Sequence, residues 1–450
     1  MGIIKVNEIQ KRTGSTLTLG GACTAVTLAP GATQSGFGRT GTVDWCTTAK
    51  TSPFTAVSGD GFFVNTSGGA ITVTLPSSPS AGDIVALKDY GNTWDTNNVT
   101  VARNGSKING QCACATLNTE SQSVTLIYVD GTKGWQDIQD STSNVTGADF
   151  VAATGGTVTE SGNFKIHTFT SSGCFQVTAA GNVAGSNKIS YMVVAGGGGG
   201  AGNVGNYDAS GGGGAGGFRE GKCSSDPYSA SPLATTALTA SVATFPVTVG
   251  AGGTGGPTTG AGSNGSLSTF STITSAGGGG GNFPTGTTPT NAAGGSGGGA
   301  AATTNQPQGT AGAGNTPPVS PPQGNPGGAY ASSGASAAGG GGGAAAAGSN
   351  APGNTVGGDG GAGATTSINA SPVQRAGGGG GSAYPGNTGG NGGAGGGGSG
   401  GKSPNNSPPA GAAGTVNTGG GGGGSNANPG NPAVGGAGGS GIVILRYQFQ

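Results

Sequence analysis

The stretch that decides the fold is Tyr191–Gly217, YMVVAGGGGGAGNVGNYDASGGGGAGG, in which a short apolar strand leads directly into five consecutive glycines. The same motif, one alanine followed by five glycines, recurs at Ala276–Gly281, Ala338–Gly343 and Ala376–Gly381. Insertions of unequal length separate these motifs. The repetition predicts one structural unit that is used several times in the second half of the chain.

Composition limits the functions that the chain can have. Its 450 residues carry a formal net charge of zero, and only 7% of them are charged and 5% aromatic. A binder of nucleic acid or of anionic membranes needs a basic stripe, so we expect neither partner. No apolar run approaches the roughly 18 residues of a membrane span, and the first residues lack the apolar core of a secretory signal. We expect a soluble protein that is made in the cytoplasm.

Cysteine and histidine do not predict a metal centre. The six cysteines (Cys23, Cys46, Cys112, Cys114, Cys174 and Cys223) form no CxxC pair, and His167 is the single histidine. We expect small, partly buried thiols in a reducing compartment, with disulfides or inter-chain linkage as the alternative, and neither a metal nor a cofactor. His167 alternates with Ile166 and Thr168 in an expected strand and is predicted at the surface or the core edge rather than as a catalytic base.

The first part of the chain predicts two kinds of β structure. Residues 1–44 hold a few alternating apolar residues between glycine turns, which is typical of short strands that dock on another subunit or intertwine with copies of themselves. Residues 45–145 contain period-2 or buried apolar runs at 62–65, 70–75, 83–88, 99–103, 124–129 and 135–139, separated by turn residues. This pattern predicts a β-sandwich or jelly roll.

Residues 146–450 are predicted to begin as strands and to continue as a glycine-rich domain. Strands are expected at 164–169, 175–178, 188–194, 243–249, 270–273 and 442–445, and glycine, alanine, serine, threonine, asparagine and proline fill the rest. Disorder is the simplest alternative for such a composition. The recurrence of the alanine-led runs and the strands between them argue against it.

Polyglycine II is the ordered conformation that glycine runs of this kind favour. It is an extended left-handed helix of three residues per turn without internal hydrogen bonds, so every N–H and C=O must find a partner on a neighbouring run. Because glycine lacks a Cβ, such helices can approach one another on all sides. We predict a lattice of packed polyglycine-II helices joined by N–H to O=C bonds and Cα–H to O contacts.

Enzymatic motifs are weak. Gly396–Ser403, GGGSGGKS, fits the phosphate-loop pattern, but glycines precede it and Pro404 follows it, where a strand and a helix are required. Between Pro227 and Leu445 the charged residues are Asp359, Arg375 and Lys402. The paired carboxylates of a glycosidase are missing there, so we expect no enzyme. A depolymerase with carboxylates from the β domain or across a subunit interface is the alternative.

The sequence resembles bacteriophage tail fibre and receptor-binding proteins, particularly those of marine tailed phages. The resemblance rests on IIKVNEIQKRTGSTLTLGG and GATQSGFGRTGTVDW at the N-terminus, on GDGFFVNTSGGAITVTLPSSPSAGDIVALKDY in the middle, and on FKIHTFTSSGCFQV, YMVVAGGGGG and GGSGIVILRY in the glycine-rich part. The last part is also similar to the glycine-helix sandwich of T-even-type phage adhesins. Unlike that adhesin, this chain carries its own anchor and β domain.

The resemblance implies a virion component, a homotrimer that is synthesised in the host cytoplasm. Its N-terminus would attach to a phage tail or adaptor protein, with Ile3, Ile4, Val6, Ile9, Leu17 and Leu19 as the attachment residues. Its distal part would contact a host surface glycan or outer-membrane protein. The insertions between glycine runs supply the receptor-binding candidates Phe283, Pro284, Tyr330, Tyr384, Asn405, Asn406, Asn426 and Asn428.

Two other functions remain open at the level of sequence. The chain could be a structural head or tail fibre without a receptor site, or a free glycine-helix protein such as an ice binder. A fibre should be trimeric and require its N-terminal segment, whereas a free binder would be monomeric and would not need the β domain.

Overall fold

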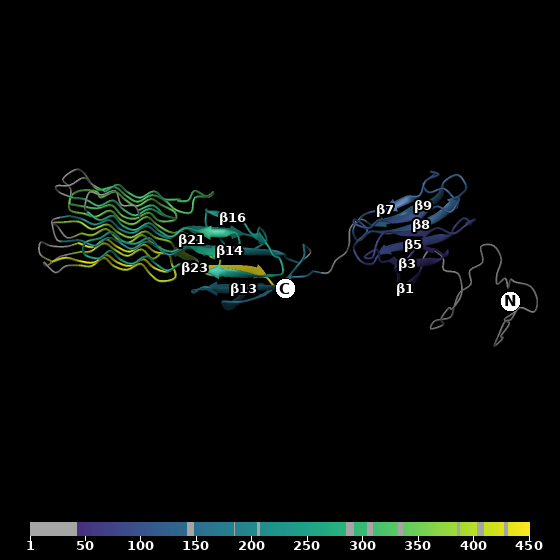
Figure 1. Ribbon diagram of the computed structural model, residues 1–450, viewed down its shortest axis with the longest axis horizontal. Helices are drawn as coiled ribbons and strands as arrows, with labels where there is room; N and C mark the ends of the chain where they lie inside the picture. Colours follow the sequence, from purple (N-terminus) through teal and green to yellow (C-terminus); the bar gives the residue numbers. More distant parts are fainter. Residues whose placement is uncertain are drawn as a thin grey trace, which may run out of the picture. The chain divides into compact units, whose positions relative to one another are not determined.

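A computed structural model describes residues 43–141, 148–183, 185–204, 208–284, 292–303, 309–331, 336–384, 388–402, 409–426 and 431–450. The chain divides into an N-terminal unit, Met1–Thr146, and a glycine-rich unit, Gly147–Gln450 (Figure 1). The regular elements of the described residues are all β-strands, which confirms the predicted all-β class. The predicted attachment segment 1–44 lies outside the described residues except at its end.

The N-terminal unit contains strands β1 to β9. They are β1 Asp44–Lys50, β2 Phe54–Thr55, β3 Asp60–Val64, β4 Ile71–Thr74, β5 Ile84–Asp89, β6 Val99–Ala102, β7 Ala115–Leu117, β8 Ser123–Asp130 and β9 Gly134–Ser141. One sheet has the order β1-β3-β5-β8-β9 and the other the order β2-β4-β6-β7.

The two sheets pack face to face through alternate side chains. Phe62 and Val64 of β3 share one buried cluster with Val73 of β4, Val101 of β6 and Trp135 of β9. The unit therefore has the two packed sheets of the predicted β-sandwich, but the order in which its strands are connected differs from that of a jelly roll. Successive strands β1 to β6 alternate between the sheets, so that β1, β3 and β5 run parallel, as do β2, β4 and β6. A jelly roll is antiparallel throughout.

The glycine-rich unit contains strands β10 to β23. They are β10 Val151–Thr154, β11 Thr157–Ser161, β12 Phe164–Phe169, β13 Gly173–Ala180, β14 Lys188–Val194, β15 Phe218–Lys222, β16 Ala234–Thr236, β17 Leu238–Thr239, β18 Ala243–Thr248, β19 Ser268–Phe270, β20 Ile273–Ser275, β21 Ala364–Thr366, β22 Val373–Arg375 and β23 Ile442–Gln448. The single strand predicted at 270–273 is wrong: Phe270 pairs with Ile273 across a tight turn in which Ser271 has a φ of 52°.

Two sheets at one end of this unit enclose an ordinary side-chain core. One sheet has the order β10-β13-β18-β19-β20, and the other has the order β11-β12-β23-β14-β15-β16, with β17 paired to β14. Strand β23 lies between β12 and β14, so the last strand closes the middle of its sheet. Phe175, Val247 and Tyr447 pack between the sheets, and Met192 and Ile444 face the opposite side, towards Ile368.

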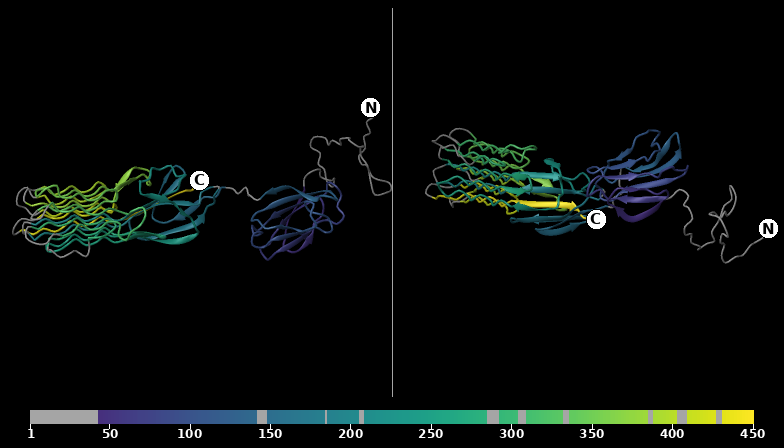
Figure 2. Two further views of the ribbon diagram at one scale, coloured as in Figure 1. Left: turned by 90° about the horizontal axis from the view of Figure 1, so that it is seen from above. Right: turned by 45° about the vertical axis from the view of Figure 1, so that its right-hand side comes forward.

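Beyond β14 the glycine runs are joined by backbone hydrogen bonds with a period of three. The amides of Gly196, Gly199 and Gly202 donate to Ser266, Ser263 and Gly260 of one neighbouring run. Those of Gly197 and Gly200 donate to Gly439 and Gly436 of a second run, and those of Gly198 and Ala201 to Gly214 and Gly211 of a third. Each run is therefore held on several sides, and the views agree that the runs lie side by side (Figures 1 and 2).

The polyglycine-II helices that the sequence predicts are not seen as regular elements, because no helix is assigned within the described residues. The hydrogen bonds nevertheless have the three-residue spacing of that conformation. The runs approach closely: a Cβ placed on Gly213, Gly378 or Gly379 would lie within 3.0 Å of a neighbouring carbonyl oxygen. Only glycine permits this packing. Among the described residues, nothing forms a helix of the length and apolarity that a bilayer crossing would require.

Candidate functional site

The end of the glycine-rich unit that faces away from its sheets, here called the tip, is the candidate site (Figure 1). Runs that leave the sheets end there, and returning runs begin there. The described residues at these run ends are linked across the unit: Asn203 pairs with Ala433, Ala209 with Ala302, and Ala337 with Ala383. Segments far apart in sequence therefore meet on one face, and the predicted receptor-binding insertions start and finish on it.

Buried serine and asparagine side chains cap the glycine runs at the tip. The Ser210 amide donates to the Ser382 hydroxyl at 2.8 Å, and the Ser210 hydroxyl donates to the Gly202 carbonyl at 2.6 Å. The Ser425 hydroxyl lies 3.2 Å from the Ala201 carbonyl and 3.1 Å from that of Ala433. These bonds occupy backbone groups where the lattice stops, so the last residues of each run remain in register.

Three of the predicted receptor-binding residues are buried. Phe283 is 8% exposed, Pro284 is also buried, and Asn426 is 1% exposed. The Asn426 amide group donates to the Ala383 carbonyl at 2.7 Å, which ties two run ends together. In this structure these residues support the tip from beneath rather than presenting a surface to solvent.

The two predicted tyrosines are half-buried at the tip. Tyr330 packs against the cluster of Ala209, Ala302 and Ala338. The backbone amide of Tyr384 donates to the Ser336 carbonyl at 2.6 Å. Both side chains keep part of their surface in contact with solvent, so among the described candidates they are the ones able to touch a partner directly.

The other predicted residues lie outside the described part of the chain. These are the receptor-binding candidates Asn405, Asn406 and Asn428 and the attachment candidates Ile3, Ile4, Val6, Ile9, Leu17 and Leu19.

The capping residues were not predicted from the sequence, although a signal for them exists. A glycine run is directly preceded by Ser210 and directly followed by Asn282, Ser382 and Ser425. Side chains of these two types bond readily to backbone groups. A serine or asparagine next to a glycine run could therefore have been identified as a cap at the lattice end.

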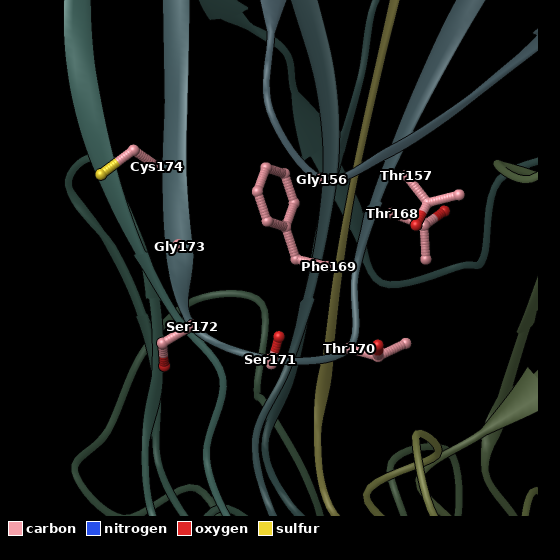
Figure 3. Close-up of a pocket in the computed structure, with 9 residues that line it drawn as sticks. All are labelled: Gly156, Thr157, Thr168, Phe169, Thr170, Ser171, Ser172, Gly173 and Cys174. Carbon is pink, nitrogen blue, oxygen red and sulfur yellow. The ribbon is translucent and has the colours of Figure 1, made fainter.

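A pocket of about 310 Å³ lies at the β12–β13 turn. Figure 3 shows the Phe169 ring standing between Gly156 on one side and the strand of Gly173 and Cys174 on the other, with Thr170 and Ser171 along the turn below. Its lining supplies hydroxyl groups and one thiol, and it contains no carboxylate, amine or imidazole.

His167 is fully buried, whereas the sequence predicted a surface or core-edge position. Its Nδ1 lies 2.7 Å from the Gly155 carbonyl, so this nitrogen carries the proton, and its Nε2 lies 3.1 Å from the Tyr447 hydroxyl. Desolvation lowers the pKa of the imidazole, and the Gly155 carbonyl opposes that shift. Both ring nitrogens are thus engaged inside the β-sandwich, where no substrate can reach them.

The described cysteines and acidic residues form no metal centre: no group of three or more His, Cys, Asp or Glu side chains in that part of the chain could hold an ion. Cys112, Cys114 and Cys174 are exposed, and Cys46 and Cys223 are partly buried, all as free thiols.

Comparison with known proteins agrees with the glycine-rich architecture. A family model described as "Glycine-rich domain" matches residues 169–448, which include the strands from β13 to β23 and all the runs between them. No curated protein matches the chain.

Proposed function

The chain belongs to the glycine-rich domain family, and from that premise we propose that it is a bacteriophage tail fibre protein that binds a receptor on the host surface. The observation that supports this proposal best is the gathering of the run ends at one tip. A scaffold in which run ends distant in sequence meet on one face can form a composite binding surface there.

The lattice beneath the tip would give this surface a fixed shape. Backbone hydrogen bonds hold each run on several sides, and Ser210, Ser382 and Asn426 fix the run ends to one another. A binding surface that is ordered before it meets its partner loses little entropy on binding. The amino-acid sequence of the insertions can therefore vary while the scaffold stays unchanged. A phage that changes its receptor requires this kind of variation.

The chemistry of the tip favours a neutral partner. Tyr330 and Tyr384 offer partly exposed aromatic faces, and the Tyr384 amide donates to the Ser336 carbonyl at the same run ends. Aromatic faces with amide and hydroxyl donors suit a host glycan or the loops of an outer-membrane protein. In this proposal the protein acts as a homotrimer, without enzymatic activity, and its residues 1–44 join it to the phage tail.

A binding assay with purified full-length chain tests the proposal. Pre-incubation of host cells with the chain should reduce adsorption of phage particles that carry it. Y384S should weaken this competition at least about 10-fold if the ring supplies one contact of about 1.4 kcal/mol. The matched control is V416S, which changes an exposed side chain, 68% accessible, at the sheet end of the same unit.

Three outcomes would contradict this function. If wild-type chain bound cells but V416S weakened binding as much as Y384S, the tip would not be the contact surface. If the chain were located on the particle by antibody labelling yet never competed for adsorption, a structural fibre without a receptor site would be the better assignment. A monomer that is absent from particles would favour a free glycine-helix binder.

A further inference from the structure

Arg375, the last residue of β22, is a buried cation for which the described part of the chain supplies no counterion. The residue is only 6% exposed, and its Nη1 atom is buried without a hydrogen-bond partner. No ion pair or side-chain hydrogen bond involves Arg375 within the described residues. Burial lowers the pKa of its guanidinium, yet an arginine remains charged near neutral pH. An uncompensated charge in this position is unfavourable and requires an explanation.

The other buried arginine of the same unit shows how this fold normally satisfies such a group. The Arg446 Nε lies 2.9 Å from Asp226 Oδ1, and its Nη1 donates to the Ile368 carbonyl at 3.4 Å. Its guanidinium also lies over the Phe164 ring, 4.5 Å from the ring centroid. Arg446 thus has a carboxylate, a carbonyl and an aromatic face, whereas the described residues offer none of these to Arg375.

A partly exposed turn packs against the backbone of Arg375. The turn at 394–397 rests on its backbone: a Cβ on Gly395 would lie 3.0 Å from the Arg375 carbonyl carbon. Gly395 and Gly396 both have positive φ, 102° and 98°. In the described part of the chain their amides donate no hydrogen bond. The buried guanidinium of Arg375 and two backbone amides without a protein acceptor therefore belong to segments that pack against each other at the sheet end of the lattice.

We propose that Arg375 and the 394–397 turn bind a small oxyanion, of the phosphate, sulfate or carboxylate class. Such an anion would supply the acceptor oxygens that the protein does not, through charge-assisted bonds to the guanidinium and bonds to the free amides. The site lies at the opposite end of the unit from the tip, so it goes beyond receptor binding. Its occupation would fix the β21–β22 hairpin to the glycine runs.

Thermal unfolding of the full chain with inorganic phosphate tests this site, at constant ionic strength with chloride as the replaced anion. Phosphate at roughly 100 times its dissociation constant should raise the Tm of the wild type by about 5 °C. R375M, which keeps the length of the side chain but removes its charge, should show no such rise. Without phosphate, R375M should unfold at or above the wild-type temperature, because it removes an uncompensated buried charge.

The control is K402M, which removes an exposed cation of the same unit and should keep the full phosphate response. Titration calorimetry of the wild type should give one phosphate per chain, which keeps the test valid if R375M fails to fold. Equal stabilisation of R375M and the wild type by phosphate would overturn the site, because that result reflects general salt exclusion. Calorimetry that shows no saturable binding would also overturn it, because the contact would then be an adventitious ion only. Phosphate that instead dissociates an oligomer, measured by light scattering, would place a carboxylate of a second copy on Arg375 and overturn the free-anion site.

Discussion

Ser210 and Ser382 are hydrogen-bonded to each other where two glycine runs reach the tip, although they lie 172 residues apart in sequence. The Ser382 hydroxyl accepts the Ser210 amide at 2.8 Å, and the Ser382 amide donates to the Ser210 carbonyl at 3.0 Å. Both residues are fully buried. A lattice built from backbone alone therefore depends on a few side chains at its boundary, where the repeating pattern of partners runs out.

S382A should destabilise the protein through this contact. The substitution leaves the Ser210 amide buried without its acceptor, which costs about 1–3 kcal/mol. Urea unfolding followed by circular dichroism would measure the loss. S266A is the control, because Ser266 is exposed and its change should stay within about 0.5 kcal/mol. Equal midpoints for wild type and S382A would contradict the capping role.

G379A should lower the free energy of unfolding more than a glycine-to-alanine change at a position with open space around it. A Cβ on Gly379 would meet the Gly422 carbonyl oxygen, and backbone on both sides leaves nothing flexible to move. We expect a loss of about 3 kcal/mol or more, at the upper end for overpacking. G353A is the matched control, since a Cβ there meets no atom within 4 Å. Similar stabilities for the two variants would refute close backbone packing of the runs.

Much of the sheet end could be predicted from sequence because its side chains carry a pattern. The strands predicted at 164–169 and 188–194 coincide with β12 and β14, since apolar residues mark buried strands. The position of β23 between them could not be predicted. Its pairing, with Leu445 opposite both His167 and Tyr191, joins segments that no local pattern connects.

The tip was less predictable, for a physical reason. Glycine has no side chain, so the partner of each run is selected by backbone geometry, about which composition and periodicity say nothing. Phe283 illustrates the effect. An aromatic residue in a polar insertion was expected at the surface, but Phe283, the second residue after a glycine run, is still inside the lattice and is 8% exposed.

Removal of Arg446 should be strongly destabilising. Its side chain and that of Asp226 are 4% and 1% exposed, so R446M leaves a buried carboxylate without its partner, at a cost of about 3–5 kcal/mol. The double variant R446M/D226L should recover much of that loss, which a double-mutant cycle would measure. E160Q, which breaks the exposed pair of Glu160 with Lys165 at 4.0 Å, should cost less than about 1 kcal/mol. A double variant as unstable as the single one would show that packing, not charge, dominates.

Cell binding by the purified chain should depend only weakly on salt. The chain has no net charge, and Asp359, Arg375 and Lys402 are the charged residues between Pro227 and Leu445. Screening therefore has few charge pairs to weaken between about 0.05 and 0.5 M NaCl. Binding to host cells across this range should change less than about 10-fold. A steep decline with salt would mean that charged groups carry the contact, against the neutral partner proposed for the tip.

His167 should make stability fall as the solution becomes acidic. Desolvation lowers the pKa of its imidazole in the folded protein, so between the unfolded pKa of about 6.5 and the lower folded pKa the unfolded chain binds more protons. The stability that neutral His167 contributes is therefore present above about pH 6.5 and is lost as the pH falls through that window, by at most about 1.4 kcal/mol per pH unit. Urea unfolding from pH 7.5 to 5 would measure the slope. H167Q keeps polar atoms near Gly155 and Tyr447 but cannot titrate, so its slope should be flatter. An identical slope in the variant would assign the acid sensitivity to other groups.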